Sequence, residues 1–407
     1  MVHLCDWSAF DPDVISSLGL AGPDTTPFWL LPLEDAPERH LIRSKIHTQS
    51  QYGFAPLPFT AKTATKSDRV RIGYFSADVY QHPVMVLLAK VLQMHDRSRF
   101  EIFFYGFSPK ESDRLQERIV AAVDVYDDVL QMRDIDIARL VRQDGIDIAI
   151  DLNGYTENSR SGICAHRAAP VQISCLGYPE SMGADLIDYI VADKNLIPKT
   201  SQACYSEKSI YLPHHYQAQD NGVPIDATVP TWTELGRPEN GFVFCVLSNS
   251  YKITPAEFDL WMRLLQAVEG SVLWLLQDNV LVLKNLMIEA AKRGVDPKQL
   301  VFAKRTDHGQ YLARFQRADL YLDTFIYNAG ATASNALWAG LPVLTKRGRG
   351  YTARMAAIKA KLASNRITTP LFNTELFTQH LEAGYQQAYD RYLEGKAPDV
   401  IEVTMPV

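Results

Sequence analysis

The stretch that decides the fold is Phe302–Pro342, F-A-K-R-T-D-H-G-Q-Y-L-A-R-F-Q-R-A-D-L-Y-L-D-T-F-I-Y-N-A-G-A-T-A-S-N-A-L-W-A-G-L-P. Its pattern predicts a helix at 309–315, an apolar strand at 320–322, a loop of small residues at 329–332 and a second helix at 333–339. Because the first helical turn leaves N–H groups without intrahelical partners, Gly330, Ala331 and Thr332 would let phosphate oxygens approach bare backbone. The same pattern is typical of an ordinary helix start, so a diphosphate site and a plain N-cap are both open at this point.

Polar and basic side chains lie where they can serve such a loop. The helix before it carries His308, Tyr311 and Arg314. Lys252 directly follows the predicted strand 242–247, at the carboxyl end of a parallel strand, where ligands bind in open α/β sheets. Arg and Lys donate the charge-assisted hydrogen bonds that diphosphates favour. Arg314 and Lys252 are therefore candidate phosphate ligands, and a solvated lysine before a helix is the alternative interpretation of Lys252.

Strands and helices alternate along most of the chain. Before a Pro- and Gly-rich link at 229–241, strands are predicted at 69–76, 100–107, 146–152, 171–176 and 189–192, with helices at 83–95 and 134–143. After the link, strands at 242–247, 271–276 and 300–303 alternate with helices at 255–267 and 280–293. Such alternation predicts an α/β fold with parallel, doubly wound sheets.

The chain of 407 residues exceeds what one core usually organises, so two domains are expected. We expect two Rossmann-like domains that face each other across a cleft, with an N-terminal helical leader. The sequence predicts a helical or irregular leader at 1–66 and an N-terminal Rossmann-like domain at 67–228. It predicts a C-terminal Rossmann-like domain at 229–365 and a C-terminal helix returning to the N-terminal domain at 366–407.

Composition limits the classes of partner. A net charge of −6 argues against broad electrostatic binding to nucleic acid or to an anionic membrane. The five cysteines are scattered without C-x-x-C spacing, which indicates neither a disulfide framework nor a zinc site and favours a reducing compartment. No segment resembles a signal peptide or reaches the roughly 20 apolar residues of a membrane span. We expect a cytoplasmic protein with no nucleic-acid partner and no membrane span.

Several nucleotide motifs are missing. Neither half carries G-x-G-x-x-G followed by an acidic residue, nor a Walker A sequence, which argues against a dinucleotide oxidoreductase and a P-loop enzyme. No D-x-D lies at the small-residue loop and the histidines are dispersed, so no metal ligand is predicted. Lysine, arginine and helix termini must then neutralise any phosphate charge.

The N-terminal half offers candidates at its own strand ends. His82 follows the strand 69–76 and holds the place that Lys252 holds in the other half. Tyr178 and Pro179 follow the strand 171–176. Asp151 ends a third strand, where it is either a loop cap or a general base with a raised pKa. A turn residue is the plain alternative for His82.

Together these segments resemble the O-GlcNAc transferase family of GT-B glycosyltransferases over nearly the whole chain. The matching motifs are C-D-W-S, R-I-G-Y-F-S-A-D, D-G-I-D-I-A-I-D-L-N-G-Y-T, R-A-A-P-V-Q-I-S-C-L-G-Y-P and A-D-L-Y-L-D-T, at 5–8, 71–78, 144–156, 167–179 and 318–324. The resemblance implies inverting, metal-independent transfer of N-acetylglucosamine from UDP-GlcNAc to Ser or Thr hydroxyls of a protein acceptor, with no resident cofactor. It also implies that the N-terminal domain lies on the acceptor side and the C-terminal domain on the UDP-sugar side.

Site residues carry over by position. Lys252 matches the family's essential diphosphate lysine, Thr332 the second threonine of its H-T-T phosphate loop, and His82 its active-site histidine. Arg314 matches a residue near the nucleotide, and Tyr178-Pro179 matches part of the sugar pocket.

The sequence departs from the family pattern at several of these positions. The departures are Gly330-Ala331 in the phosphate loop, Asn335 at a usually acidic position, Tyr311 in place of histidine, Asn249 in place of glutamine and Glu180 in place of glycine. Each predicts altered donor binding. After Ala357, several tens of residues that the family normally has are missing before K-L-A-S-N-R at 361–366, and no tetratricopeptide repeats precede the catalytic region. A UDP-binding scaffold and another GT-B reaction, such as Asn glucosylation or sugar-nucleotide epimerisation, are therefore alternatives.

Overall fold

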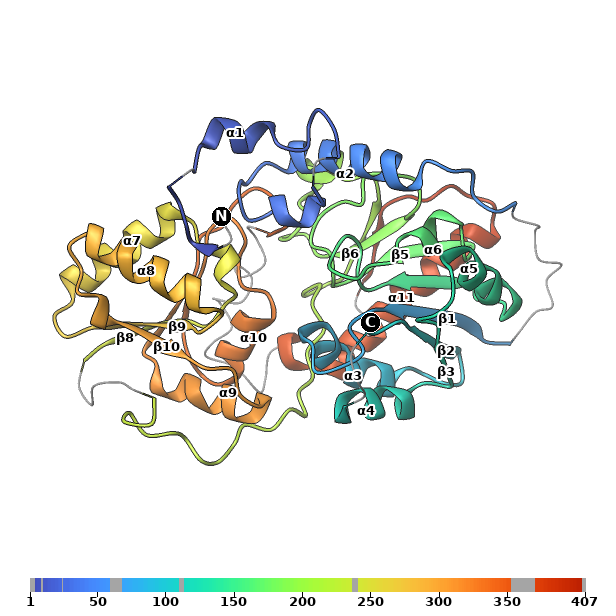
Figure 1. Cartoon of the computed structure of the whole chain (residues 1–407). Helices are drawn as coiled ribbons and strands as arrows, with labels where there is room; N and C mark the ends of the chain where they lie inside the picture. Colours follow the sequence, from blue (N-terminus) through green and yellow to red (C-terminus); the bar gives the residue numbers. More distant parts are fainter. Residues whose placement is uncertain are drawn as a thin grey trace. The chain divides into compact units, whose positions relative to one another are not determined.

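The computed structural model describes residues 4–8, 10–23, 25–58, 68–109, 113–235, 241–352 and 370–404 (Figure 1). The chain forms two compact units, each built around one parallel sheet. The large-sheet unit comprises Gly19–Phe28, Pro37–Asn221 and Pro370–Val407, and the small-sheet unit comprises Met1–Leu18, Trp29–Ala36 and Gly222–Thr369. The residues expected to form a leader are thus shared between the two units.

The sheet of the large-sheet unit has the strand order β13-β7-β6-β5-β4-β1-β2-β3, and all of these pairs are parallel. The strands are β1 (Val70–Ser76), β2 (Phe100–Gly106), β3 (Val125–Asp128), β4 (Ile148–Asp151), β5 (Val171–Ser174), β6 (Tyr189–Ala192), β7 (Lys208–Tyr211) and β13 (Ile401–Glu402). Its helices are α2 (Pro37–Tyr52), α3 (Pro83–Met94), α4 (Arg114–Ala122), α5 (Asp134–Gln143), α6 (Gly162–Ala165) and α11 (Thr374–Leu393). Near-continuous apolar strands such as β1 and β4 are buried on both faces, as parallel sheets require.

The sheet of the small-sheet unit has the order β10-β9-β8-β11-β12, again parallel throughout. Its strands are β8 (Val243–Val246), β9 (Val272–Leu276), β10 (Leu300–Ala303), β11 (Leu320–Leu322) and β12 (Val343–Leu344). The helices are α1 (Pro12–Ser17), α7 (Pro255–Ala267), α8 (Val280–Lys292), α9 (His308–Arg314) and α10 (Ala331–Trp338). In Figure 1, α7 and α8 lie on one side of this sheet and α9 lies on the other.

One core cluster joins the N-terminal residues to the small sheet. Cys5 and Trp7 pack with Phe258 and Trp261 of α7, and the Trp7 and Phe258 ring centroids are 5.3 Å apart. Thr254 and Glu257 form a capping box that begins α7, with Pro255 at its first position. The start of α7 is therefore fixed by its own sequence, which places the turn that precedes it at the end of β8.

The chain leaves the large-sheet unit after Asn221 and returns to it at Pro370. Its two crossing points lie together within this unit. His215 Nε2 is 3.0 Å from the main-chain oxygen of Pro370. The Thr374 hydroxyl donates to the main-chain oxygen of Gln219 at 2.7 Å and accepts from the N–H of Asn221 at 3.3 Å. The exit and the return are thus joined by hydrogen bonds.

The prediction of an α/β fold with two Rossmann-like, parallel-sheet domains is confirmed. The ranges predicted for α5, β6, α7, β10 and β11 agree with the structure. The sequence reading missed α4 and the short strands β3, β7, β12 and β13. The domain boundaries stay a prediction, and the segment expected to be shortened after Ala357 lies outside the described residues.

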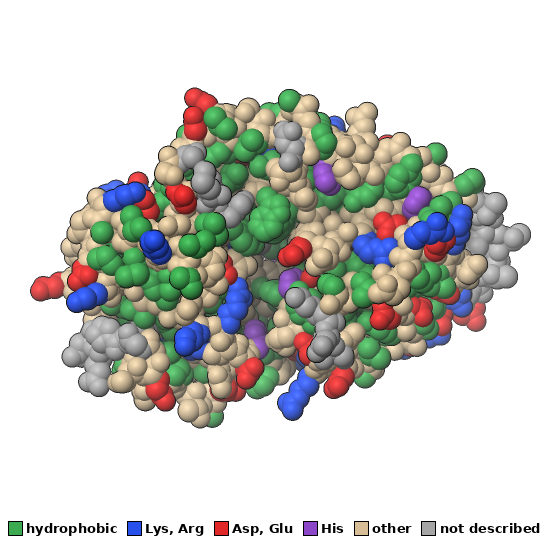
Figure 2. Space-filling model, viewed as in Figure 1, with side chains coloured by type: hydrophobic (Ala, Val, Ile, Leu, Met, Phe, Trp, Pro, Cys, Tyr) green, Lys and Arg blue, Asp and Glu red, His purple; other side chains and the backbone are tan. Residues whose placement is uncertain are grey.

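Charged side chains of both signs are interspersed on the face shown in Figure 2. All five cysteines are free thiols. In the part of the chain that the structure describes, no helix combines the length and the apolar character that crossing a membrane requires.

Candidate functional site

The carboxyl edge of the small sheet gathers the segments that follow four of its strands. Because the sheet is parallel, these segments meet at one edge. Lys252 ends a short turn after β8, Asp278 follows β9, Arg305 follows β10, and Asp323 is the first residue after β11. Of these four residues, the sequence analysis singled out Lys252.

Lys252 is buried, with 9% of its surface exposed. Its ammonium donates to the main-chain oxygen of Asn328 at 3.3 Å and lies 4.0 Å from the centre of the Tyr327 ring, a cation–π contact. Burial lowers the pKa of Lys252, and the nearby charge of Asp323 raises it in part. An ammonium has three N–H groups, and the hydrogen bond described for it uses one, so Lys252 can also donate to an anion.

The loop after β11 surrounds this ammonium. Asp323 receives hydrogen bonds from the N–H of Thr324 at 2.9 Å, the N–H of Ala329 at 2.7 Å and the hydroxyl of Thr345 at 2.7 Å. Burial raises the pKa of Asp323, while these hydrogen bonds and Lys252 lower it in part. The Asn328 side chain is wholly buried, and its Oδ1 has no hydrogen-bond partner among the described residues. The sequence reading missed Asp323 and Asn328.

A second polar group lies at the same edge. Arg305 donates to Asn249 Oδ1 at 3.1 Å and to Asp278 Oδ1 at 3.3 Å. Asp278 in turn accepts from the hydroxyl of Ser250 at 2.7 Å. The predicted residue Asn249 is therefore held beside an exposed cation, Arg305. The sequence analysis missed Arg305, because a single charged residue in a loop forms no pattern.

The predicted phosphate loop forms the start of α10. Gly330 is the N-cap, and its lack of a side chain leaves the first-turn N–H groups, at Ala331 and Thr332, to acceptors outside the helix. No acidic residue occupies this first turn. The positive end of the helix dipole is therefore uncompensated by side chains of its own turn, which favours an anion there.

Tyr311 of α9 links the other predicted residues to α10. Burial raises the pKa of its hydroxyl, and the nearby side chains of Thr332 and Asn335 lower that pKa in part. Tyr311 and Asn335 are two of the positions at which this chain departs from the family pattern, and the structure makes them partners. His308 lies beside Tyr311, with ring centroids 6.0 Å apart. Arg314 is half-buried and donates to the main-chain oxygen of Lys304.

His82 lies in the large-sheet unit, at the carboxyl end of β1. It caps α3, where its Nδ1 is 3.4 Å from the N–H of Val84 and 3.6 Å from Asp78 Oδ2. Asp78 also accepts from Asn153 Nδ2 at 2.9 Å. Burial lowers the pKa of His82 to about 4 and raises that of Asp78 to about 6. At neutral pH this group is a neutral imidazole beside a carboxylate.

Tyr178 and Pro179 are buried in the large-sheet unit. The Tyr178 hydroxyl lies 3.4 Å from the hydroxyl of Ser44 on α2, and its ring centroid is 5.2 Å from that of Tyr155. Asp151, the other candidate base, is buried as well. Its Oδ1 accepts from the N–H groups of Asn153 and Gly154, so it caps a loop, and burial raises its pKa. These contacts give Tyr178 and Asp151 roles in packing and loop formation.

The predicted site residues thus fall into two sets. The small-sheet unit holds Asn249, Lys252, His308, Tyr311, Arg314, Gly330, Ala331, Thr332 and Asn335. The large-sheet unit holds His82, Tyr178 and Pro179. Within the described residues, no group of three His, Cys, Asp or Glu side chains is arranged to hold a metal ion.

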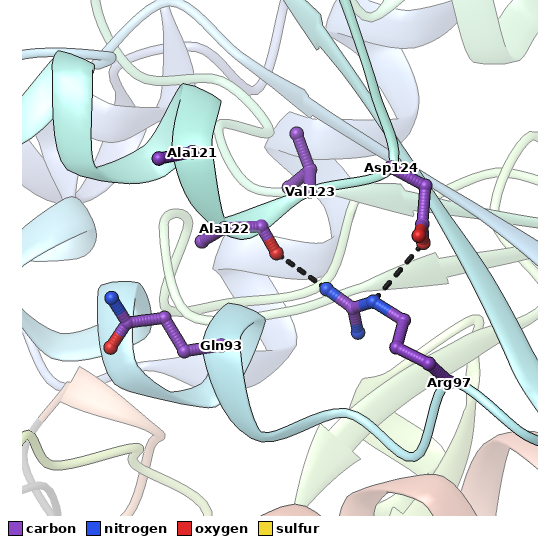
Figure 3. A pocket seen from close by; sticks show the side chains of 6 residues that line it. All are labelled: Gln93, Arg97, Ala121, Ala122, Val123 and Asp124. Atoms are coloured by element: carbon purple, nitrogen blue, oxygen red, sulfur yellow. Dashed lines mark hydrogen bonds and ion pairs between the residues drawn. The ribbon is translucent and has the colours of Figure 1, made fainter.

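A cavity of about 480 Å³ lies at the ends of α3 and α4 and shares no residue with the predicted site (Figure 3). It is lined by Gln93, Arg97, Ala121, Ala122, Val123 and Asp124. Arg97 pairs with Asp124 at 3.1 Å and donates to the main-chain oxygens of Leu92 and Ala122. Its guanidinium therefore joins the ends of α3 and α4 through hydrogen bonds, which is a structural role.

Comparison with known proteins shows the family. The chain matches glycosyl transferase family 41 over residues 39–222 and 214–359. It is 31% identical over 399 residues to a protein of Arabidopsis thaliana named "Probable UDP-N-acetylglucosamine--peptide N-acetylglucosaminyltransferase SEC", covering 87% of this chain and 41% of that protein. It is 24% identical over 483 residues to a UDP-N-acetylglucosamine–peptide N-acetylglucosaminyltransferase of Caenorhabditis elegans, covering 87% of this chain and 42% of that protein. The chain therefore spans less than half the length of these relatives.

A solved structure agrees. A mutant of the O-GlcNAc transferase of Thermobaculum terrenum matches with a TM-score of 0.73 and 27% sequence identity, covering 95% of this chain and 74% of that chain. The family model matches most of the chain, and the Arabidopsis relative is 31% identical over 87% of it. The chain belongs to glycosyl transferase family 41.

Proposed function

We propose that this chain transfers N-acetylglucosamine from UDP-GlcNAc to Ser or Thr hydroxyls of a protein acceptor, with inversion at the sugar. The observation that carries the proposal is the buried Lys252 at the carboxyl edge of the small sheet, held by Asn328 and Tyr327. Membership of family 41 and the names of the relatives support the donor and the acceptor.

The donor half of the proposal rests on charge. When the bond between the sugar C1 and the phosphate oxygen breaks, its electron pair leaves with UDP. A preorganised cation and helix N–H groups stabilise that developing charge. Lys252 supplies the cation, and the first turn of α10 at Ala331 and Thr332 supplies the N–H groups. Tyr311 of α9 lies beside Thr332 and Asn335 of α10.

The acceptor half rests on His82. The acceptor oxygen attacks C1 and its proton passes to a base. His82 is a neutral imidazole at pH 7, since burial lowers its pKa to about 4. As a base, His82 uses the tautomer in which Nδ1 carries the proton toward Asp78, 3.6 Å away, instead of accepting from the N–H of Val84; Nε2 then has a free lone pair that can take the acceptor's proton. We propose this role for His82 and place Asp78 behind it as the residue that holds the ring.

The proposal is tested by calorimetric titration with UDP of the wild-type chain, of Lys252→Ala and of a matched control, Lys284→Ala, which changes an exposed lysine on α8. Wild type and control should bind alike, and Lys252→Ala should bind at least about tenfold more weakly, because a charge-assisted contact contributes about 1.5–3 kcal/mol. Equal binding by all three proteins would contradict the assignment of Lys252.

Product analysis separates the proposed reaction from its rivals. Incubation with UDP-GlcNAc labelled in the sugar and a Ser/Thr-containing peptide mixture should place label on peptide hydroxyls. Label on Asn, or an epimerised nucleotide sugar, would indicate another GT-B reaction, and UDP binding without any turnover would indicate a scaffold.

The charge argument also predicts how a chelator acts. If Lys252 and the α10 N–H groups neutralise the diphosphate, addition of EDTA should leave the transfer rate within about twofold of the untreated rate, since chelation removes no group used in the step. Loss of transfer with EDTA and its return with added Mg²⁺ or Mn²⁺ would contradict metal-independent catalysis.

A further inference from the structure

One carboxylate closes the loop that surrounds Lys252. Asp323 is 1% exposed. Its Oδ1 accepts from the N–H groups of Thr324 and Ala329, which lie at the two ends of the loop, and its Oδ2 accepts from the hydroxyl of Thr345 beyond β12. Two hydrogen bonds to a single buried side chain therefore join the ends of residues 324–329, and the third ties that side chain to Thr345.

That loop supplies the contacts of the ammonium. Asn328 offers the main-chain oxygen at 3.3 Å, and Tyr327 offers its ring face at 4.0 Å. Asn328 is itself tied to the loop, because its Nδ2 donates to the main-chain oxygen of Thr324. Asp323 thus acts on Lys252 through the shape of the loop, and its charge acts from beyond the 4.0 Å of a direct ion pair.

We propose that Asp323 is the positioning residue and resident counter-charge of Lys252. It keeps the buried amine in its ammonium form before an anionic diphosphate arrives, and the diphosphate then takes over as the main counter-charge. The inference rests on the proposed function, which identifies the anion as the diphosphate of UDP, and it adds a second residue to the donor site.

The electrostatics of the two buried groups support the role of Asp323 as the counter-charge of Lys252. A buried amine without a counter-charge loses its proton, because desolvation disfavours the charged form. Burial lowers the pKa of Lys252 and Asp323 opposes that effect, while Lys252 in turn opposes the effect of burial on the pKa of Asp323.

Other titratable groups also lie around the loop. The ammonium of Lys346 is 5.5 Å from the centre of the Phe325 ring, and the ring centroid of Tyr251, whose pKa burial raises, is 6.0 Å from that of Tyr327. Tyr321 of β11 is a buried neutral phenol with a raised pKa, and Glu257 of α7, whose pKa burial raises, accepts from the N–H of Phe325.

The test is the substitution Asp323→Asn, which removes the charge and keeps the hydrogen bonds. The amide oxygen can accept from Thr324 and Ala329, and the amide nitrogen can donate to the Thr345 hydroxyl, which can turn to accept. UDP affinity is measured by calorimetry from pH 6 to pH 9. In wild type it should fall at high pH as Lys252 loses its proton. In Asp323→Asn the fall should begin at least about one pH unit lower, so that the variant binds about tenfold more weakly near pH 8 and as tightly as wild type near pH 6.

Two further variants separate charge from shape. Asn328→Ala removes the hydrogen bond from Nδ2 to the main-chain oxygen of Thr324, which holds the loop, and leaves every hydrogen bond of Asp323 in place, so it should weaken UDP binding by the same factor at every pH. Asp319→Asn changes a carboxylate at the amino end of the same sheet, where Oδ2 accepts from the N–H of Val243 at 2.8 Å, and should leave the pH profile unchanged. A profile for Asp323→Asn that runs parallel to wild type would overturn the inference.

A measurement without nucleotide keeps the inference distinct from the proposed function. The ¹³Cε resonance of Lys252, assigned with Lys252→Arg, is titrated in the ligand-free protein. Its midpoint should be lower in Asp323→Asn than in wild type, and an unchanged midpoint in a variant with the wild-type circular dichroism spectrum would overturn the inference. If wild type failed to bind UDP while this midpoint shifted, the proposed function would fall and the pairing of Asp323 with Lys252 would stand.

Discussion

The two pairs of ionisable side chains at the carboxyl edges of the two sheets are built in opposite ways. Lys252 and Asp323 are almost wholly buried, and the loop after β11 that contacts Lys252 is closed by hydrogen bonds to Asp323. His82 and Asp78 are more open, with side-chain exposures of 31% and 12%. A buried cation suits an anion whose charge grows during reaction, because a low dielectric strengthens the interaction. A half-exposed imidazole suits an acceptor that must enter as part of a protein chain.

The largest expected effect follows from removing the buried cation. Lys252→Ala should lower the transfer rate by about 10²–10³-fold, the loss found when a group that stabilises leaving-group charge is removed. It should also weaken UDP binding, because the proposed function has Lys252 donate to the same phosphate oxygens before and during the reaction. Measurement of kcat and KM checks both effects, and a change in KM alone would show that the ammonium only binds the ground state.

The pair of His82 and Asp78 should respond differently to substitution. His82→Ala should lower kcat by about 10²-fold, the contribution of a positioned base, and leave UDP affinity within about twofold of wild type. Transfer to a peptide is compared with calorimetric binding of UDP for the same preparation. If His82→Ala lowered peptide transfer and UDP affinity by the same factor, the proposed difference between the Lys252 and His82 pairs would be wrong.

The fall of kcat/KM at low pH should reflect the protonation of Asp78. Burial raises its pKa to about 6, so its carboxylate is present above that pH and is lost as the pH falls below it. Protonated Asp78 no longer favours a proton on His82 Nδ1, and kcat/KM should therefore fall from pH 7 to pH 5 with a midpoint near 6. Asp78→Asn should flatten this limb at a lowered rate. A midpoint near 4, unaltered by the substitution, would point to His82 alone.

The smallest effect is expected from the helix start behind the buried pair. Thr254 and Glu257 form the capping box of α7, and Glu257 also accepts from the N–H of Phe325 in the loop. Thr254→Ala should lower the free energy of unfolding by about 1 kcal/mol, as loss of an N-cap does, with no change in the pH dependence of UDP binding. Urea unfolding and calorimetry provide the two readouts.

The sequence predicted the buried cation better than its surroundings. Lys252 was found because it follows an apolar strand in a parallel α/β pattern, where position alone indicates a ligand site. Asp323 also follows a strand, but a strand-end aspartate is commonly a loop cap, and its effect on Lys252 depends on contacts 71 residues apart in the chain. Arg305 was missed for the same reason, because its partners Asn249 and Asp278 come from other strand ends.

The elements that the sequence missed are short or weakly apolar. β12 and β13 have two residues each, too few for any period, and they form because a neighbouring strand offers its edge. β3, V-Y-D-D, is polar because it lies at the edge of its sheet. The partnership of Tyr311 with Asn335 joins α9 to α10, and no local pattern encodes it.

The hydrogen bonds between the exit at Asn221 and the return near Thr374 make Gly222–Thr369 an insertion with adjoining ends. A graft made there needs a short bridge from Asn221 to Pro370, and α11 keeps its place in the large-sheet unit. Met1–Leu18 and Trp29–Ala36 belong to the same unit as the inserted segment and must be exchanged with it. Under the proposed function, exchanging these segments between relatives is a way to change the sugar donor while the large sheet stays unaltered.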